Sequence, residues 1–333
     1  MSALPPWFDP AWQRLRTQRT QDRLPHALLI HGPEGIGERD FVRALAAAAL
    51  CETPEDGDAC GHCDGCVLFR AGNHPDYSEV RPEEEGKQLR IDQIRDLAGF
   101  VGLSRGRAPY KVVVLTPADR LNDNAANALL KTLEEPPPRT LLLLLTSRPG
   151  RLPATIRSRC QRVPLHAPTP DQARAWLAER LPAGADADVL LALAHGAPQA
   201  ALALAGGDTL TRRAAFLDDF GSCLDGRLGV VAFAGKWCKE AQATLAAWLN
   251  DVLADAIRRA SGAPSRLSEQ SADGAGLRRL PEALDLQSMF KLLHELQQYR
   301  RLLETPVNPQ MLLEGLAVSW KSALAAQAPR RNG

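Results

Sequence analysis

The stretch that decides the fold runs from residue 26 to residue 51 and reads HALLIHGPEGIGERDFVRALAAAALC. Its first six residues, 26–31, form an apolar run that is typical of a buried parallel strand. Glycines at 32, 35 and 37 follow, and residues 39–51 have alanine-rich helical periodicity. A strand, a glycine-rich turn and a helix in this order form the setting of a phosphate-binding loop. The stretch therefore predicts an α/β domain that contains such a loop.

The loop departs from the G-x-x-x-x-G-K-[ST] motif at the positions that carry its chemistry. Gly32 and Gly37 have the motif's spacing, but Glu38 and Arg39 stand where Lys and Ser or Thr are needed. That Lys contacts the β- and γ-phosphates, and the hydroxyl binds Mg²⁺. Since unit charges ~4 Å apart interact by about 4 kcal/mol at an effective dielectric near 20, a carboxylate there turns strong attraction into repulsion. One alternative is an active ATPase in which Arg39 supplies the missing cation.

Further strands and helices alternate along the first half of the chain. Apolar runs at 111–117, 140–147 and 161–166 predict strands, and NDNAANALLKTLEEPPP at 122–138 predicts a helix ended by prolines. Alternating strands and helices indicate a parallel sheet that is covered on both faces.

The pattern changes near residue 168, after which no strand-like run occurs. Three short helical stretches occupy 170–206, and longer helices follow from 210 to 325, interrupted by a Gly, Ser and Pro loop at 261–276. We therefore expect three domains, at 1–166, 167–207 and 208–333. The leucines of the last domain are expected either in its own core or at a subunit interface; they include Leu292, Leu293, Leu296, Leu302 and Leu303.

The composition excludes several classes of protein. The 333 residues carry a formal net charge of +1, so no global field draws the molecule to nucleic acid or to an anionic membrane. The leucine run at 141–145 is too short to cross a bilayer, and the N-terminus lacks the regions of a signal peptide. We expect a cytosolic protein with no membrane partner, whose seven cysteines are thiols or metal ligands.

Four cysteines are closely spaced, at Cys51, Cys60, Cys63 and Cys66, in the pattern C-x8-C-x2-C-x2-C. Four thiolates around Zn²⁺ make a closed, structural site. The alternatives are four free thiols, an iron–sulfur cluster, which lacks the usual downstream Cys-Pro here, and a zinc ribbon that binds nucleic acid. His62 is expected to be a solvated bystander. Cys223 and Cys238 are expected to be ordinary buried side chains.

Three motifs carry a family resemblance. AANALLKTLEEPP at 125–137, LPATIRSRC at 152–160 and GNHPD at 72–76 resemble the clamp-loader branch of the AAA+ ATPases, as found in the bacterial DNA polymerase III clamp loader. The resemblance implies an α/β AAA+, phosphate-loop-like parallel-sheet domain with a zinc-binding insertion at 51–66. It also implies a small helical lid domain and an all-α C-terminal collar domain.

The same resemblance implies that this chain has lost its own ATP site. Thr116 and Pro117 stand where the family's ATPases carry an acidic pair for magnesium, and Asp119 lies two residues further on. Gln199 stands where active relatives place an arginine against the γ-phosphate. With Glu38 in the loop, every expected contact to ATP within the chain is altered, so we expect no bound ATP.

One catalytic feature of the family remains. Ser158, Arg159 and Cys160 form the SRC motif, whose arginine in the family projects into the ATP site of a neighbouring subunit. A guanidinium suits this role because it is planar and permanently charged. A surface arginine in an ordinary salt bridge is the alternative. Cys160 is expected to pack in the interior, since no His–Cys pair is evident.

The function implied by the resemblance is that of a fixed, non-hydrolysing subunit of the clamp loader. Such a chain is not an enzyme by itself but belongs to a holoenzyme that is a DNA-directed DNA polymerase, a nucleotidyltransferase. Its expected partners are the ATPase (gamma/tau) and delta subunits and, through the assembly, the sliding clamp and primed DNA. Its expected location is the bacterial replisome at the nucleoid.

Overall fold

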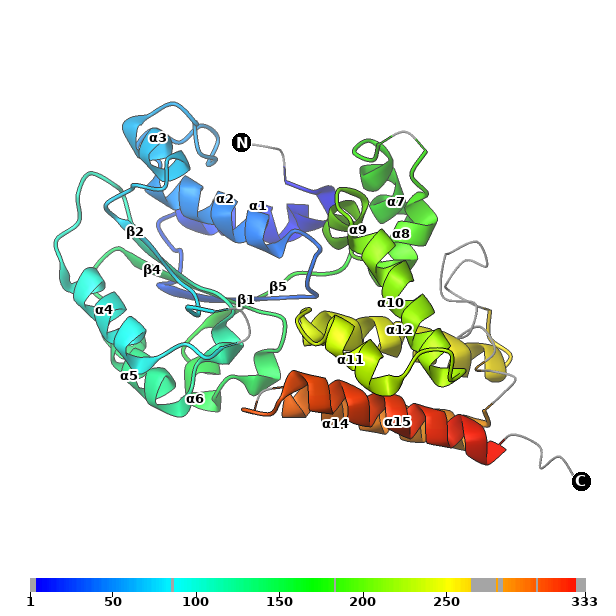
Figure 1. The fold of residues 1–333 in the computed structure, drawn as a ribbon. Coiled ribbons are helices and arrows are strands. Elements are labelled where there is room, and N and C mark those ends of the chain that lie inside the picture. Colours follow the sequence, from blue (N-terminus) through cyan, green and yellow to red (C-terminus); the bar gives the residue numbers. More distant parts are fainter. Residues whose placement is uncertain are drawn as a thin grey trace, which may run out of the picture. The chain divides into compact units, whose positions relative to one another are not determined.

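The computed structural model describes residues 4–84, 87–182, 184–264, 280, 284–303 and 305–327 (Figure 1). The chain divides into two compact units. One unit comprises Met1–Arg180 with Gly196–Ala200, and the other comprises Leu181–His195 with Ala201–Gly333. The division into three domains at 166 and 207 stays a prediction. Most of the loop expected at 261–276 lies outside the described residues.

The first unit is built on one parallel sheet with the strand order β2-β3-β4-β1-β5. The strands are β1 (Ala27–His31), β2 (Tyr77–Val80), β3 (Lys111–Leu115), β4 (Thr140–Thr146) and β5 (Gln161–Pro164). β1 lies between β4 and β5, so that Leu28 pairs with Leu143 on one side and with Gln161 on the other. Because β1 is covered by neighbours on both edges and by helices on both faces, its residues Ala27 to Ile30 are almost completely buried.

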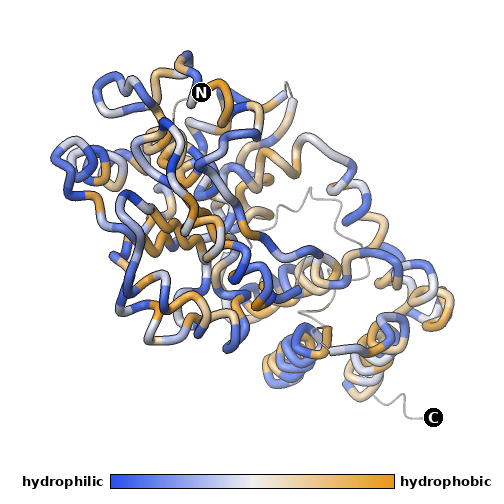
Figure 2. The backbone as a smooth tube through the Cα atoms, turned by 90° about the vertical axis from the view of Figure 1, so that its left-hand side faces the viewer, coloured by the Kyte–Doolittle hydropathy of each residue, from blue (hydrophilic) through white to orange (hydrophobic). Residues whose placement is uncertain are grey.

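Helices cover both faces of this sheet, and the alternation of side chains along each strand explains why. Leu28 and Ile30 point to the face that holds α1 (Asp9–Thr20) and α2 (Glu38–Leu50). Leu29 points to the other face, which holds α4 (Ile91–Gly102), α5 (Asp123–Glu134) and α6 (Ala154–Arg157). The two layers of helices are visible in Figure 1, and Figure 2 shows hydrophobic segments in the interior and hydrophilic segments at the periphery.

Short elements complete the first unit. They are the 3-10 helices η1 (Pro6–Phe8), η2 (Ala118–Arg120) and η3 (Pro149–Arg151), together with α3 (Asp64–Arg70) and α7 (Pro170–Ala178). The prediction of an α/β parallel-sheet domain with a cysteine-containing insertion and helices after it is confirmed. β2 was not predicted, because YSEV is short, lies at the sheet edge and buries only Val80.

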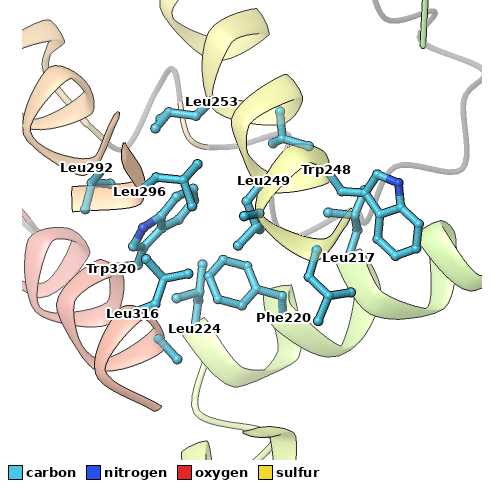
Figure 3. Packing of buried hydrophobic residues seen from close by; sticks show 14 of the residues in the cluster. Leu217, Phe220, Leu224, Trp248, Leu249, Leu253, Leu292, Leu296, Leu316 and Trp320 are labelled. Carbon is cyan, nitrogen blue, oxygen red and sulfur yellow. The ribbon is translucent and has the colours of Figure 1, made fainter. Parts of the chain in front are cut away.

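The regular elements described in the second unit are all helices. Its helices are α8 (Ala187–Leu193), most of α9 (Pro198–Ala205), α10 (Thr209–Leu224), α11 (Val230–Trp237), α12 (Gln242–Ala260), α14 (Leu286–Leu302) and α15 (Pro309–Gln327). Their apolar faces meet around Phe220, Leu249 and Trp320 (Figure 3). Leu292 and Leu296 belong to this core, Leu293 and Leu303 pack partly against it, and Leu302 is exposed. Most of these leucines therefore stabilise the unit itself.

Among the described residues, no single helix has both the length and the apolar character needed to cross a membrane. Within the same residues, α8 and α9 meet those two criteria only when they are taken together as a bent pair.

Candidate functional site

The four closely spaced cysteines converge on one point. Cys51 follows the last residue of α2, Cys63 caps α3, and Cys66 lies in the first turn of α3. All four sulfur atoms lie within 4.8 Å of one another, and Cys51 Sγ is 3.6 Å from Cys60 Sγ and 3.8 Å from Cys63 Sγ. A metal bonded to four sulfurs at about 2.3 Å in a tetrahedron separates them by about 3.8 Å. The group therefore has the dimensions of a four-thiolate metal site.

Hydrogen bonds to the sulfur atoms suit thiolates. The backbone N–H of Cys60 donates to Cys51 Sγ at 3.3 Å, and the N–H of Cys63 donates to Cys60 Sγ at 3.3 Å. The Thr53 hydroxyl also donates to Cys60 Sγ, which lowers the pKa of the Cys60 thiol. Burial acts in the opposite direction and raises the pKa of Cys51 and Cys66. A cation at the centre would keep all four deprotonated.

The other histidine and cysteine expectations have mixed outcomes. His62 is exposed and lies 3.1 Å from the carbonyl oxygen of Cys60, outside the group of four sulfurs. Cys223 is completely buried, as expected. The expectation for Cys238 was wrong, because it is only partly buried and its thiol contacts the Gly235 carbonyl at the end of α11.

The cysteine loop is fastened to the body of the first unit by α1. The guanidinium of Arg19 donates to the carbonyl oxygens of Ala48 and Gly57. The indole N–H of Trp12 donates to Asp58 Oδ1 at 2.9 Å. These contacts hold the middle of the segment between Cys51 and Cys60 against α1.

The GNHPD segment joins the cysteine loop to the rest of the sheet. Asp76 is 1% exposed, and both of its carboxylate oxygens accept from the backbone N–H of Gly106, at 2.9 and 3.1 Å. Its own N–H donates to Nδ1 of the buried His74 at 3.0 Å. Lys111, at the start of β3, donates to the Leu103 carbonyl at 2.8 Å. The segment thus anchors the loop that precedes β3, which is a structural role.

The phosphate loop lies between β1 and α2, and the side chain of Glu38, the first residue of α2, lies against it. The backbone N–H of Gly37 donates to the Glu38 carboxylate at 3.2 Å. In a nucleotide-binding loop, such N–H groups at a helix N-terminus face the phosphates. The carboxylate is favoured there because the helix dipole places partial positive charge at the start of α2. Glu38 therefore satisfies part of the cradle that a phosphate would fill, while Arg39 is exposed.

The beginning of α9 packs directly against this loop. The N–H groups of Gln199 and Ala200 donate to the Gly35 carbonyl at 3.0 and 3.1 Å, and the Gln199 side chain donates to Asp40. A Cβ atom added to Gly35 would lie 2.7 Å from the Ala200 Cβ. On the other side, the Trp7 indole donates to the Ile36 carbonyl at 3.0 Å. The loop is thus held by protein contacts on both sides.

The positions that the resemblance assigns to magnesium binding have other partners. Thr116 is buried at the end of β3, and the peptide bond between it and Pro117 is cis. The Asp119 carboxylate accepts a hydrogen bond from the Thr146 hydroxyl at the end of β4. Ser147 donates to Glu34 of the phosphate loop at 2.6 Å. No free acidic pair therefore faces the loop from the described part of β3.

Arg159 lies in the short segment between α6 and β5. Its side chain is 36% exposed, and its Nη2 is 2.5 Å from Oε1 of Glu134, the last residue of α5. Its Nη1 donates to the Thr155 carbonyl at 2.9 Å. Cys160 is 7% exposed, and burial raises the pKa of its thiol to about 11, so it is unsuited to act as a nucleophile. Ser158 donates to the Thr155 carbonyl at 3.1 Å.

Arg159 and the phosphate loop lie at opposite edges of the sheet. The loop follows the carboxyl end of β1, whereas Arg159 precedes the amino end of β5. Because β1 and β5 are parallel neighbours, these ends are separated by the length of a strand, about 3.3 Å per residue. Arg159 therefore lies away from the phosphate loop of its own chain.

Comparisons with known proteins show the family of the chain. Residues 8–169 match the family described as "DNA polymerase III, delta subunit", and residues 207–322 match "DNA polymerase III, delta subunit, C terminal". A DNA polymerase III subunit delta' of Pseudomonas aeruginosa is 37% identical over 332 residues, covering 97% of this chain and 98% of that protein. The chain belongs to the delta' subunits of DNA polymerase III.

Other relatives support this family. The subunit delta' of Escherichia coli is 39% identical over 262 residues, covering 78% of this chain and 77% of that protein. The E. coli subunit tau is 36% identical over 152 residues, covering 46% of this chain and 23% of that protein. A gamma subunit-related protein from Thermotoga maritima has a TM-score of 0.49 at 19% identity, covering 93% of this chain and 99% of that one, a likeness too low to support an inference.

Two residues of these sites were not predicted from the sequence. Thr53 follows the first cysteine and contacts Cys60 Sγ, but a hydroxyl near cysteines has no distinctive spacing. Glu134 lies within the motif AANALLKTLEEPP, yet nothing in that motif indicates that it pairs with Arg159.

Proposed function

We propose that this chain is the non-hydrolysing subunit of the DNA polymerase III clamp loader and lends Arg159 to the ATP site of a neighbouring ATPase subunit. The observation that carries the proposal is the contrast between the two ends of the parallel strands. The phosphate loop is filled by Glu38 and by the start of α9, while Arg159 is exposed at the opposite edge. The chain then acts as a fixed partner that completes the catalytic site of its neighbour.

The phosphate loop supports this proposal by its charge as well as by its contacts. A triphosphate brought to Gly37 would meet the Glu38 carboxylate in place of a lysine. Repulsion of about 4 kcal/mol at ~4 Å and an effective dielectric near 20 replaces an attraction of the same size. Three further changes remove the remaining contacts, at Thr116, Pro117 and Gln199.

The chemistry of the Arg159 guanidinium supports the proposed role of this residue in a neighbouring ATP site. An arginine supplied from a neighbouring subunit stabilises the charge that develops on the γ-phosphate and can raise the rate by about 10³–10⁵. Its five donors match phosphate oxygens in pairs, which a lysine cannot reproduce.

Partners and cofactor follow from the family. The ATPase (gamma/tau) and delta subunits would be direct partners, and the sliding clamp and primed DNA would be reached through the assembly, at the replisome in the cytoplasm. We propose a structural Zn²⁺ held by Cys51, Cys60, Cys63 and Cys66, with no ATP bound by this chain. The helices of 208–333 would form the collar, after a lid at 167–207.

Two measurements test this proposal. Calorimetric titration of the isolated chain with ATP and Mg²⁺ should show no binding at millimolar concentration. In the assembled complex, Arg159→Ala should lower DNA-stimulated ATP hydrolysis by at least about tenfold, and Arg159→Lys should recover little of it, because a lysine lacks the paired donors. Full hydrolysis with Arg159→Ala would contradict the assignment of Arg159.

The alternative of an active ATPase has a distinct signature. Arg39 is exposed and lies next to the loop, so a cation is available there. Micromolar ATP binding by the isolated chain that disappears with Arg39→Ala would replace our proposal with this one. For a nucleic-acid-binding zinc module, the signature would be DNA binding that falls steeply with salt and is lost when the cysteines are replaced.

A further inference from the structure

The ion pair between Arg159 and Glu134 has a consequence for when the arginine can act. We propose that Glu134 is a positioning residue that holds the Arg159 guanidinium against this chain and releases it only to a neighbour that carries a γ-phosphate. The inference rests on the proposed role of Arg159. It adds a nucleotide-sensing step that the arginine by itself does not have.

The first observation is that both terminal nitrogens of Arg159 are in use. Nη2 pairs with Glu134 Oε1 at 2.5 Å, and Nη1 donates to the Thr155 carbonyl at 2.9 Å. A guanidinium that meets two phosphate oxygens in parallel uses these same nitrogens. The guanidinium therefore has to leave the Glu134 carboxylate before it can form a paired contact with a phosphate.

The second observation is that the stability of α5 does not explain Glu134. It is the last residue of α5, where the helix dipole favours a cation and disfavours a carboxylate. The last turn of α5 also contains Lys131, which suits that end of the helix. A carboxylate at this position is better explained by what it binds across the surface, which is Arg159.

The third observation is the solvent exposure of the two side chains, because exposure determines how strongly Glu134 attracts Arg159. The two side chains are 36% and 49% exposed. An exposed ion pair shifts the equilibrium between its paired and separated forms by no more than about fivefold. A bound phosphate can therefore displace the Glu134 carboxylate from the guanidinium. A γ-phosphate carries more negative charge than one carboxylate and therefore competes well with Glu134 for the Arg159 guanidinium. Without a γ-phosphate, the arginine returns to Glu134.

Glu135 provides a matched control. It is the next residue, is also an exposed glutamate, and among the described residues it shows no ion pair with Arg159. The experiment therefore compares Glu134→Gln with Glu135→Gln, each in the full-length chain assembled with the ATPase and delta subunits. The change from Glu to Gln keeps the size of the side chain and removes its charge.

The readout is ATP hydrolysis by the assembled complex in the absence of DNA. We expect Glu134→Gln to raise the rate about two- to fivefold and to strengthen inhibition by ADP, because no carboxylate draws the arginine back from an empty γ-phosphate position. Glu135→Gln should behave as the unaltered complex does. A rate that stays the same or falls with Glu134→Gln would overturn the inference.

A double variant separates this inference from the role of Arg159. In the background of Arg159→Ala, Glu134→Gln should change nothing, since its effect acts through the guanidinium. If Arg159→Ala itself leaves hydrolysis intact, the proposed function fails. If Arg159→Ala abolishes hydrolysis while Glu134→Gln has no effect, only the positioning role of Glu134 fails. Unchanged thermal unfolding of Glu134→Gln would show that folding is not the cause of its effect.

Discussion

The carboxylate of Glu38 accepts a hydrogen bond from the backbone N–H of Gly37 at 3.2 Å, within the loop that would cradle a phosphate. The residue that replaces the expected lysine therefore does more than remove a positive charge. It places an anion of the chain's own in the position where the helix N-terminus attracts one.

Restoring the lysine should not restore a nucleotide site. With Glu38→Lys, the loop regains its cation, but Gln199 and Ala200 still contact Gly35, and no acidic pair follows β3. We expect calorimetry to detect no ATP binding by this variant at millimolar concentration. Tight binding after this single change would mean that the contacts of α9 yield readily to a nucleotide.

The cysteine cluster should contain about one zinc per chain, and the purified protein should be colourless. Cys51→Ser removes one of the four ligands and should lower the free energy of unfolding by more than about 3 kcal/mol. Metal content by atomic emission and thermal unfolding provide the two measurements.

Cys238→Ser is the control for that experiment. Cys238 lies in the helical unit, outside the group of four sulfurs, so its replacement should leave the zinc content unchanged. Iron with visible charge-transfer absorption would rule out zinc. A chain without zinc that stays fully folded but fails in the assembly would show that the metal has a role beyond stability.

Two glycines should respond to alanine in opposite directions. A Cβ atom on Gly106 would lie 3.0 Å from Asp76 Oδ2, and the Gly106 N–H is the donor that both Asp76 oxygens use. Gly106→Ala should therefore destabilise the protein by about 1–3 kcal/mol, since a buried carboxylate loses good hydrogen bonds. Chemical denaturation would measure the change.

Gly99→Ala is the matched comparison. Gly99 lies inside α4, and a Cβ atom there meets nothing within 4 Å. This substitution should stabilise the protein by about 0.5–1 kcal/mol through helix propensity alone. Equal effects of the two substitutions would contradict the anchoring role of Asp76.

The core of the helical unit should be far more sensitive than its surface. Trp320 is completely buried and packs edge-on against Phe220 at a ring-centroid distance of 5.1 Å (Figure 3). Trp320→Ala should lower the free energy of unfolding by about 3–5 kcal/mol. Val318→Ala, on the exposed side of the same helix, should change it by less than about 0.5 kcal/mol. Urea denaturation of the two variants would compare them directly.

The features that the sequence determined are those formed by neighbours in the chain. The apolar run at 26–31, the glycines and the alanine-rich segment predicted β1, the loop and α2, because backbone geometry and side-chain periodicity act over a few residues. The cysteine spacing predicted that four sulfurs would meet, and they do. The short edge strand β2 has no such local signal.

Tertiary structure decided what lies across the loop and beside the arginine. Gln199 reaches Gly35, and Glu134 reaches Arg159, only because the chain returns to the same sheet after long intervals. No local pattern records such a meeting, since it depends on how strands and helices pack together. The motifs therefore named candidate residues, and the fold decided that Glu38 and the start of α9 lie against the phosphate loop while Arg159 lies at the other ends of the strands.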